Sequence, residues 1–388
     1  MQTPVYLDYN ATTPVAEAAL RRMQPYLRER FGNPSSGGHA FGWMAEEAVE
    51  LAREEVAALL GVEERPAEAL TFTSGATEAL NLAIKGVARA YQAKGRHVVT
   101  CRTEHKAVLG ACRALEARGG DVTYLPVEEN GRVDPVRFAE ALTGETVLAA
   151  VMLANNETGV LQPIEELAEI AREAGVLFLT DATQAVGKIP VEAERADLLV
   201  ASAHKFYGPK GAGVLYRSRR RPRVRSEPLI HGGGQEGGLR GGTLNVPALA
   251  GMGAAAELAQ EHRSEDAARL EALRDRFEKH LKAEIPDVRI NGAGTERLPQ
   301  TANVTFPGVR AETLESELRD LAVSTGSACS TGSKAPSHVL KGMGLTDAEA
   351  RATLRFSLGR PTTEEEVQFA AERVTEAVGE LRSAPVAA

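Results

Sequence analysis

Short apolar runs of β-forming residues alternate with segments of helical periodicity over the first 250 positions of this 388-residue chain. Helices are predicted at residues 17–30, 45–60, 78–94, 106–118, 135–142 and 164–174. Seven strands are predicted, at residues 70–73, 97–100, 121–127, 147–154, 176–180, 197–201 and 213–216. Such alternation is typical of a parallel sheet with helices on both faces. The sequence therefore predicts an α/β fold built on a mostly parallel, seven-stranded sheet.

The pattern changes after about residue 250. A long helical stretch at 248–282 leads into short strands and helices, and the chain ends with an amphipathic segment at 364–382. We predict a large α/β domain over residues 15–250. Residues 1–14 and 251–388 are predicted to form a smaller α+β domain.

Composition and patterning argue against several classes of protein. The 45 Lys and Arg residues against 53 Asp and Glu give a net charge of −8, which disfavours nucleic acid as an obligatory partner. No apolar run approaches the ~18 residues of a membrane span, and the N-terminus lacks the basic and apolar regions of a signal peptide. Three cysteines, at positions 101, 112 and 329, fit neither a disulfide framework nor a CxxC metal site. These features predict a cytoplasmic protein with reduced thiols, no membrane partner and no intrinsic metal.

Ligands of open α/β sheets bind beyond the carboxyl ends of the strands, where the first predicted strand leads into Ser74-Gly75-Ala76-Thr77. A helix follows at once, and the free N–H groups of its first turn suit a phosphate. Taken alone, the same residues are equally consistent with an ordinary helix cap. The dinucleotide-binding and P-loop glycine patterns do not occur here, so those two classes are poorly supported.

Two later strands end in charged residues. Asp181 follows the strand at 176–180, and a carboxylate there needs a partner, either an ion pair or cap or a protonated ring nitrogen. Lys205 follows the strand at 197–201, beside Ser202 and His204. A lysine at this place is either a surface group or a Schiff-base amine. A phosphate seat, a carboxylate for a ring nitrogen and an amine are together the groups that pyridoxal 5′-phosphate (PLP) needs.

Two further strand ends fit the same cofactor. His105 is placed to stack on a ring or to transfer a proton, although a surface histidine at a helix start is an alternative. Asn156, in Asn155-Asn156-Glu157, offers an amide to a ring substituent or belongs only to a turn.

Cys329 lies in a run of small residues, Ser324 to Ser333, that contains two glycines and no bulky side chain. Such a segment is predicted to be exposed and flexible, which suits a thiolate that attacks at one place and delivers at another. The alternative is a tolerated surface cysteine. Cys101, in a strand, and Cys112, in a helix, are predicted to be packing residues.

Two other segments stand out by composition. Residues 217–225 contain six arginines and are either a solvated loop or a docking site for an acidic protein or RNA. Residues 231–242 contain seven glycines, which favours a loop that brings its backbone close to a ligand or to another chain.

These motifs, in this order, resemble those of the NifS/IscS-type cysteine desulfurases, which are class V, fold-type I PLP enzymes. The resemblance runs from Tyr6-Leu7-Asp8-Tyr9-Asn10 to Leu354-Arg355-Phe356 and covers nearly the whole chain. Its central motifs are Thr73-Ser74-Gly75-Ala76-Thr77-Glu78, Thr103-Glu104-His105, Asn155-Asn156-Glu157, Asp181-Ala182-Thr183-Gln184 and His204-Lys205.

The resemblance implies a role for each matched residue around the cofactor. Lys205 would form the Schiff base and move the Cα proton, Asp181 would hold the pyridinium nitrogen and Gln184 the ring oxygen. His105 would stack on the ring and assist proton transfer, with Asn156 nearby. The phosphate would be bound by Ala76, Thr77, Ser202 and His204, and by Thr243 from the partner of a homodimer with shared active sites. Arg355 would bind the substrate carboxylate, a task suited to a bidentate guanidinium.

The implied reaction converts L-cysteine to L-alanine and leaves the sulfur on Cys329 as a persulfide. The segment around Cys329 resembles the long-loop group of the family, which delivers sulfur to an iron–sulfur scaffold or a tRNA-thiolation carrier. On such a scaffold Cys329 would be a transient cluster ligand. The chain stops soon after Leu381, without the longer tail of many IscS-like proteins, which weakens the choice of acceptor. Selenocysteine lyase or another class V PLP enzyme, and a non-catalytic sulfur carrier, are the alternatives.

Overall fold

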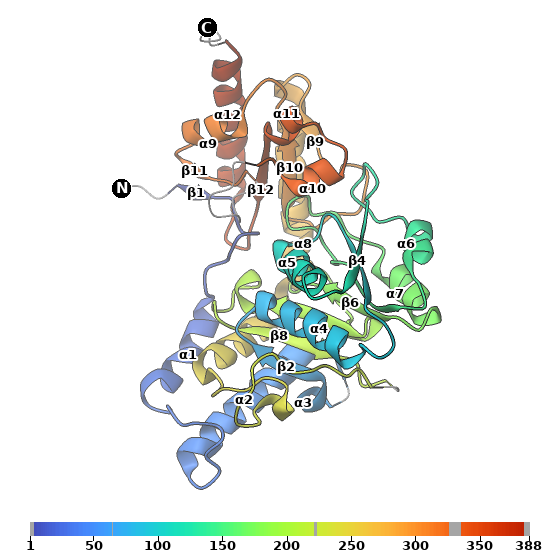
Figure 1. The fold of residues 1–388 in the computed structure, drawn as a ribbon. Coiled ribbons are helices and arrows are strands. Elements are labelled where there is room, and N and C mark those ends of the chain that lie inside the picture. The colour runs from blue at the N-terminus through green and yellow to red at the C-terminus, as the bar shows by residue number, and fades with distance from the viewer. Residues whose placement is uncertain (1–3, 64, 221–222, 326–334, 384–388) are drawn as a thin grey trace.

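The computed structural model describes residues 4–63, 65–220, 223–325 and 335–383, with a large α/β part and a smaller part at the top of Figure 1. The central sheet has the strand order β2-β8-β7-β6-β5-β3-β4. Its strands are β2 (Leu70–Thr73), β3 (His97–Cys101), β4 (Asp121–Leu125), β5 (Thr146–Ala150), β6 (Leu177–Asp181), β7 (Leu198–Ser202) and β8 (Gly213–Arg217). Only β8 runs antiparallel to its neighbours within this sheet. The predicted seven-stranded, mostly parallel sheet is confirmed.

Helices cover both faces of the sheet because its strands alternate apolar side chains between the faces. In β3, Val98 packs on the side of α4 (Ala76–Ala90) and α5 (Lys106–Glu116), whereas Val99 packs on the opposite side. That opposite side carries α1 (Glu17–Arg28), α2 (Ala40–Leu59), α6 (Pro135–Ala141) and α7 (Ile164–Glu173). Short helices at α3 (Pro66–Ala69), Ala193–Arg195, Ala203–Lys205 and Glu236–Gly238 complete the large part.

The predicted strand at 147–154 is too long, because β5 ends at Ala150. The chain nevertheless stays extended beyond it, since the N–H groups of Val151 and Leu153 donate to the carbonyls of Leu179 (3.0 Å) and Asp181 (3.0 Å). This continuation alongside β6 brings the following asparagines to the end of the strand that carries Asp181.

The smaller part is built on the antiparallel sheet β12-β10-β9, formed by β12 (Thr353–Ser357), β10 (Thr301–Thr305) and β9 (Arg289–Ile290). Helices α9 (Ala311–Glu317) and α12 (Glu364–Ser383) pack in the hydrophobic core of this sheet. Buried residues of α10 (His338–Gly342) and α11 (Asp347–Ala350) instead pack with β3, α6 and α7 of the large part. The N-terminal strand β1 (Val5–Tyr6) pairs in parallel with β11 (Leu321–Ala322), so the start of the chain lies beside this part (Figure 1).

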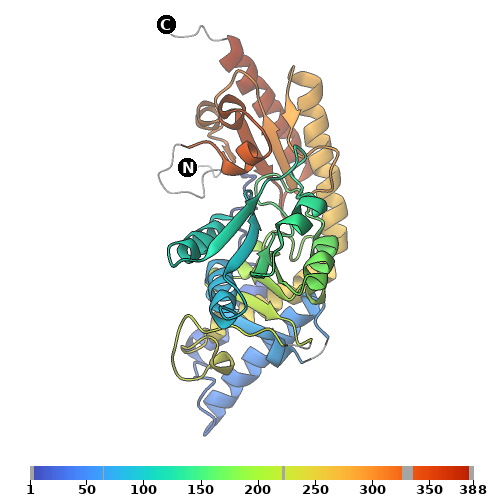
Figure 2. The ribbon, with the colours of Figure 1, turned by 45° about the vertical axis from the view of Figure 1, so that its right-hand side comes forward.

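One helix, α8 (Val246–Glu284), contributes buried residues to a core of the large part and to the core of the smaller part. Its 39 residues span about 58 Å, and Figure 2 shows it running along one side of the molecule. Its first half packs with α1 and α2, whereas Leu270, Phe277 and Leu281 pack with the small sheet and α12. The helix crosses residue 250, so the domain limits given above stay a prediction. Among the described residues, none of the helices combines the length and the apolar character that a bilayer span requires.

Replacing Phe356 by alanine is expected to destabilise the smaller part. Phe356 is 1% exposed, and its ring lies 4.8 Å from that of Phe277 and 6.5 Å from that of Phe306. The cavity left behind should lower the free energy of unfolding by about 3–5 kcal/mol. Phe369→Ala is the matched control, because this phenylalanine on α12 is 39% exposed and should cost less than about 1 kcal/mol. Urea unfolding of both variants checks this, and equal losses would contradict the assignment of this core.

Candidate active site

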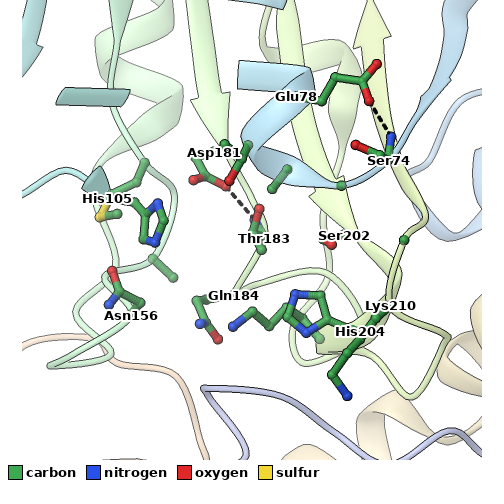
Figure 3. A pocket seen from close by; sticks show the side chains of 17 residues that line it. Ser74, Glu78, His105, Asn156, Asp181, Thr183, Gln184, Ser202, His204 and Lys210 are labelled. Carbon is green, nitrogen blue, oxygen red and sulfur yellow. Dashed lines mark hydrogen bonds between the residues drawn. The ribbon is translucent and has the colours of Figure 1, made fainter. Parts of the chain in front are cut away.

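A cavity of about 410 Å³ lies beyond the carboxyl ends of β6 and β7 and beside the first turn of α4 (Figure 3). In this view His105 and Asn156 lie on one side and Ser202, His204 and Lys210 on the other, with Asp181, Thr183 and Gln184 between them. The residues predicted from the sequence that line the cavity are Ala76, Thr77, His105, Asn156, Asp181, Gln184, Ser202, His204 and Lys205. The fold therefore brings these residues together, while their individual roles remain predictions.

Two glycines shape the turn between β2 and α4. Gly75 has φ +149°, which side chains rarely tolerate, and it precedes the first helical residue. A Cβ added at Gly213, on the neighbouring strand β8, would lie 2.5 Å from the Gly75 Cα. The missing side chain at Gly213 lets β8 pack closely against Gly75, and Gly75 itself lines the cavity beside the helix start.

The side of the cavity at this helix start suits an anion. The first-turn N–H groups of α4 have no intrahelical partner, and Thr77 and Ser202 add hydroxyl groups. Burial favours the neutral form of Glu78, but hydrogen bonds from Arg240 (2.9 Å) and Ser74 (2.8 Å) outweigh it and lower the pKa of the carboxyl. Both oxygens of the Glu78 carboxylate therefore accept hydrogen bonds from Arg240 and Ser74.

His204 is neutral at pH 7 in this surrounding. Burial and then the positive charges of Lys205, Lys210 and Lys188 lower the pKa of His204 to about 4. Its Nδ1 lies 3.2 Å from the Thr12 hydroxyl. The imidazole can therefore form a hydrogen bond to an anion without adding a charge.

The opposite side of the cavity suits a heteroaromatic ring. Asp181 Oδ1 accepts from the Thr183 N–H (3.0 Å). This bond leaves the second carboxylate oxygen, Oδ2, for another donor. His105 Nδ1 accepts from the Ala107 N–H (3.1 Å), which places the proton of the neutral ring on Nε2. Burial outweighs the nearby Asp181 carboxylate and lowers the pKa of His105. A neutral imidazole can stack on a ring and exchange a proton through Nε2.

The Lys205 amine is held by the N-terminal segment. Its Nζ donates to the carbonyls of Asn10 (2.6 Å) and Ala11 (2.8 Å). On its other side, the buried ammonium of Lys188 donates to the Lys205 main-chain carbonyl. Burial and then the charge of Lys205 lower the pKa of Lys188 to about 7. The active-site lysine is therefore fixed at both its amine and its backbone.

Two buried carboxyl groups lie directly behind the cavity. Glu104 Oε1 accepts from the Met152 N–H (2.7 Å) and the Cys101 thiol (3.2 Å), while Oε2 has no hydrogen-bond partner in the described part of the chain. Burial, aided by the Asp181 charge, raises the pKa of Glu104 to about 8. Burial also raises the pKa of Glu157 to about 7, against the opposing effects of Ser337 and Arg355. Glu104 is therefore mainly protonated at neutral pH.

Among the described residues, two that were predicted for the site do not line the cavity. Arg355 is 1% exposed, and it donates to Asp8 Oδ1 (2.6 Å) and to the Asn156 carbonyl (2.9 Å) directly beside the cavity. Thr243 is exposed to solvent and lies outside the cavity lining. Cys329 lies outside the described residues.

The structure also describes Cys101, Cys112 and residues 217–220 and 223–225 of the arginine-rich segment. Cys101 and Cys112 are buried, as predicted for packing residues, and burial raises the pKa of both thiols. Arg219 pairs with Glu68, Arg220 donates to the Glu194 carbonyl, and the Arg225 guanidinium lies 5.1 Å from the centre of the Tyr91 ring. These contacts account for three of the arginines, and a docking role for the segment stays a prediction.

Sequence reasoning missed several residues around the site, notably Lys188, Thr183 and Asn10. Lys188 carries a usable signal, since a lysine within Ala185-Val186-Gly187-Lys188-Ile189 interrupts an otherwise apolar run. Thr183 stands between two residues that were singled out. Asn10 lies 195 positions before Lys205, so nothing local indicates that the two meet.

The cavity fits PLP in the chemistry of its donors and acceptors. Thr183 Oγ1 and Gln184 Oε1 are buried and have no hydrogen-bond partner among the described residues. The open helix start suits the phosphate, and Asp181 suits a protonated ring nitrogen. Within the part of the chain that the structure describes, no cluster of His, Cys, Asp and Glu could hold a metal ion.

A family model described as aminotransferase class-V matches residues 5–369. The chain belongs to the class-V aminotransferase family. Enzymes of this family depend on PLP, which confirms the cofactor predicted from the strand ends.

Known relatives of this member of the class-V family are cysteine desulfurases. Over 384 residues it is 53% identical to cysteine desulfurase IscS of Anaeromyxobacter dehalogenans and 52% identical to that of Neisseria meningitidis FAM18, covering 98% of this chain and 94% of each relative. A solved NifS-like protein is 38% identical, with a TM-score of 0.89 over 97% of this chain and 100% of that one. A structure of SspA in complex with cysteine is 39% identical, with a TM-score of 0.80 over 91% and 98% of the two chains. The resemblance to the NifS/IscS-type enzymes is confirmed.

Replacing Glu104 by glutamine should change how stability depends on pH. The folded-state pKa of about 8 lies above the ordinary 4.5, so the stabilisation from its bound proton is complete below 4.5 and is lost as the pH rises toward 8. Wild type should lose up to about 1.4 kcal/mol per pH unit relative to Glu104→Gln in this window. Urea unfolding of both proteins at pH 5.5, 6.5 and 7.5, with equal cofactor content, measures the difference. A constant difference across the three pH values would contradict a protonated Glu104.

Proposed function

We propose that this protein is a homodimeric cysteine desulfurase that converts L-cysteine to L-alanine and stores the sulfur on Cys329 as a persulfide. The observation that carries the proposal is the meeting of Lys205, Asp181 and the start of α4 around one cavity. A class-V fold and a relative that is a cysteine desulfurase at 53% identity support it. The delivered sulfur would go to an acceptor protein in the cytoplasm, either an iron–sulfur scaffold or a tRNA-thiolation carrier.

The cofactor would be held by residues from several strand ends. Ala76, Thr77, Ser202 and His204 would bind its phosphate, Asp181 its ring nitrogen and Gln184 its ring oxygen, with His105 against the ring. When bound, PLP withdraws electrons from the substrate Cα and so makes its proton acidic. Lys205 would hold the cofactor covalently at rest and take that proton during turnover, with His105 Nε2 assisting proton transfer.

The substrate carboxylate would bind beside Asn156. Arg355 presents a planar guanidinium there, already oriented by Asp8 Oδ1 and the Asn156 carbonyl. Its Nε is buried and has no hydrogen-bond partner among the described residues. A preoriented guanidinium loses little freedom when it binds a carboxylate, which supports its choice as the anchor.

The sulfur step balances without an added oxidant. The Cys329 thiolate attacks the sulfur of the substrate, an S–S bond forms, and the Cβ–S bond breaks. The electron pair of that bond stays on Cβ and takes up a proton, which gives alanine. In sum, cysteine and the Cys329 thiol become alanine and the Cys329 persulfide.

Exposed aromatic residues support a homodimer. Phe31 and Trp43 are 65% and 56% exposed, and the Phe31 ring lies 5.2 Å from that of Phe41. This apolar surface adjoins the glycine-rich segment 231–242. Pro34, three residues after Phe31, lines the same cavity as Glu236 of that segment. A second copy would cover the surface and receive Thr243 at its phosphate site.

The activity is tested on the purified protein with its cofactor. We expect a yellow protein whose absorption spectrum changes with L-cysteine, which yields alanine, and whose Cys329 peptide gains one sulfur atom in mass spectrometry. A protein that cannot be loaded with PLP, or that consumes cysteine without sulfur on Cys329, would refute the proposal.

Lys205→Ala should abolish turnover while the protein still folds. Loss of the base and of the covalent link to the cofactor should lower the rate of alanine formation at least about 10²–10⁴-fold. Lys94→Ala is the matched control, because Lys94 also donates to a main-chain carbonyl, that of Gly175 (2.5 Å), but is exposed and lies outside the cavity lining. Turnover of Lys205→Ala within tenfold of wild type would exclude the assigned role.

Cys329→Ala should separate cysteine binding from sulfur transfer. The cofactor absorption should still respond to L-cysteine, whereas no persulfide should form. Mass spectrometry of the peptides that contain Cys101 and Cys112 completes the measurement. Sulfur bound to either of them, or sulfide release at the wild-type rate, would speak against Cys329 and for another class V activity such as that of a selenocysteine lyase.

A further inference from the structure

The turn that carries Asn156 contacts the downstream flank of the segment with Cys329 directly and the upstream flank through Arg355. Asn156 itself lines the cofactor cavity, whereas its neighbour Glu157 is buried behind it. Residues 326–334 carry Cys329 and connect two described flanks, which end at Thr325 and begin again at Ala335. The contacts that follow are made by described residues of these two flanks only.

The upstream flank is joined to the turn through Arg355. The Arg355 N–H donates to the Ser324 carbonyl (2.7 Å), and the Ser324 N–H donates to the Arg355 carbonyl (3.2 Å). The Arg355 guanidinium in turn donates to the Asn156 carbonyl (2.9 Å). Ser324 is therefore only one residue removed from the turn.

The downstream flank contacts the turn directly. Ser337 Oγ donates to Glu157 Oε2 (2.5 Å), and both residues are 3% exposed. The next residue, His338, has its Nε2 2.9 Å from the Glu104 carbonyl, beside His105. Ser337 Oγ also accepts from the Leu340 N–H (3.2 Å) and thereby caps α10.

The turn that carries Asn156 and Glu157 is held in place by several buried hydrogen bonds. The Asn155 side-chain oxygen accepts from the N–H groups of Glu157 (2.9 Å) and Thr158 (3.0 Å). Its side-chain nitrogen donates to the Thr103 carbonyl (3.1 Å), and Asn155 is 2% exposed. The Glu157 carbonyl accepts from Asn303 Nδ2 (3.2 Å). The turn is thus tied to β10 and to the segment that carries His105.

Chain length limits where Cys329 can go. It lies five residues after Ser324 and eight before Ser337, so even extended chain allows at most about 18 Å and 29 Å from the two flanks. Fixing both flanks to a turn at the cavity therefore limits the distance over which the chain between them has to reach the substrate sulfur. A short connecting chain favours an intramolecular attack by the thiol.

We propose that Glu157, by holding Ser337, is a positioning residue for the transfer of sulfur to Cys329. The proposal rests on the function proposed above for Cys329. Glu157 and Ser337 are not among the residues that line the cofactor cavity, so we assign them no direct contact with PLP or cysteine. The competing explanation is that their contact serves only to start α10.

Three variants separate these explanations. Ser337→Ala removes both the Glu157 contact and the α10 cap. Thr346→Ala is the matched control, because Thr346 caps the next helix, α11, through the Glu349 N–H (3.3 Å) and does not contact Glu157. Glu157→Gln retains an oxygen that accepts from Ser337, whereas Glu157→Ala does not.

The holoenzymes are mixed with L-cysteine in single-turnover experiments that follow both the cofactor absorption and the Cys329 persulfide by mass spectrometry. Ser337→Ala and Glu157→Ala should form the persulfide at least about tenfold more slowly, with an unchanged absorption response to cysteine. Glu157→Gln and Thr346→Ala should stay within about twofold of wild type.

Two results would overturn the positioning role alone. One is a persulfide rate of Ser337→Ala equal to that of Thr346→Ala, and the other is an equal loss of the absorption response and of the persulfide rate. Absence of persulfide on Cys329 in wild type would instead overturn the proposed function, and the positioning role with it.

Discussion

The N-terminal segment joins the two parts of the molecule at the active site. The carbonyls of Asn10 and Ala11 accept from the Lys205 amine, while the Thr13 hydroxyl donates to the His204 carbonyl (3.1 Å) and accepts from the Tyr207 N–H (2.9 Å). On its other side the Asn10 side chain donates to the Thr301 hydroxyl of the small sheet (2.9 Å). The position of the Lys205 amine relative to both sheets therefore depends on one short stretch of chain.

Burial sets the charge of the groups around this amine. It raises the pKa values of Glu104 and Glu157 and lowers those of His204 and Lys188. Each shift favours the neutral form, because uncompensated charge is costly away from water. The groups behind the cavity can therefore form hydrogen bonds without adding net charge. The electrostatic potential in the cavity is then set mainly by the charged groups that line it.

Much of this arrangement follows from local sequence. Alternating patterns predicted the seven-stranded sheet, and because parallel strands end at one edge, Asp181 and Lys205 had to meet there. The contacts that orient them were not predictable, since Asn10 to Lys205, Asp8 to Arg355 and Glu157 to Ser337 are separated by 195, 347 and 180 positions. Helix and strand ends were also missed where turns and tertiary hydrogen bonds decide them, as at the end of β5. The roles of Thr243 and Cys329 come only from the resemblance.

The pairing of β1 with β11 and of Asp8 with Arg355 also imposes an order on biosynthesis. Residues 5–8 pair with residues that are translated much later, since 316 positions separate Val5 from Leu321 and 347 separate Asp8 from Arg355. At the usual elongation rate this is a delay of roughly 16–70 s. Until then the contacts of residues 5–8 with the smaller part cannot form, although all strands of the seven-stranded sheet have been translated. A nascent chain can thus fold the core of its large sheet before these long-range contacts with the smaller part form.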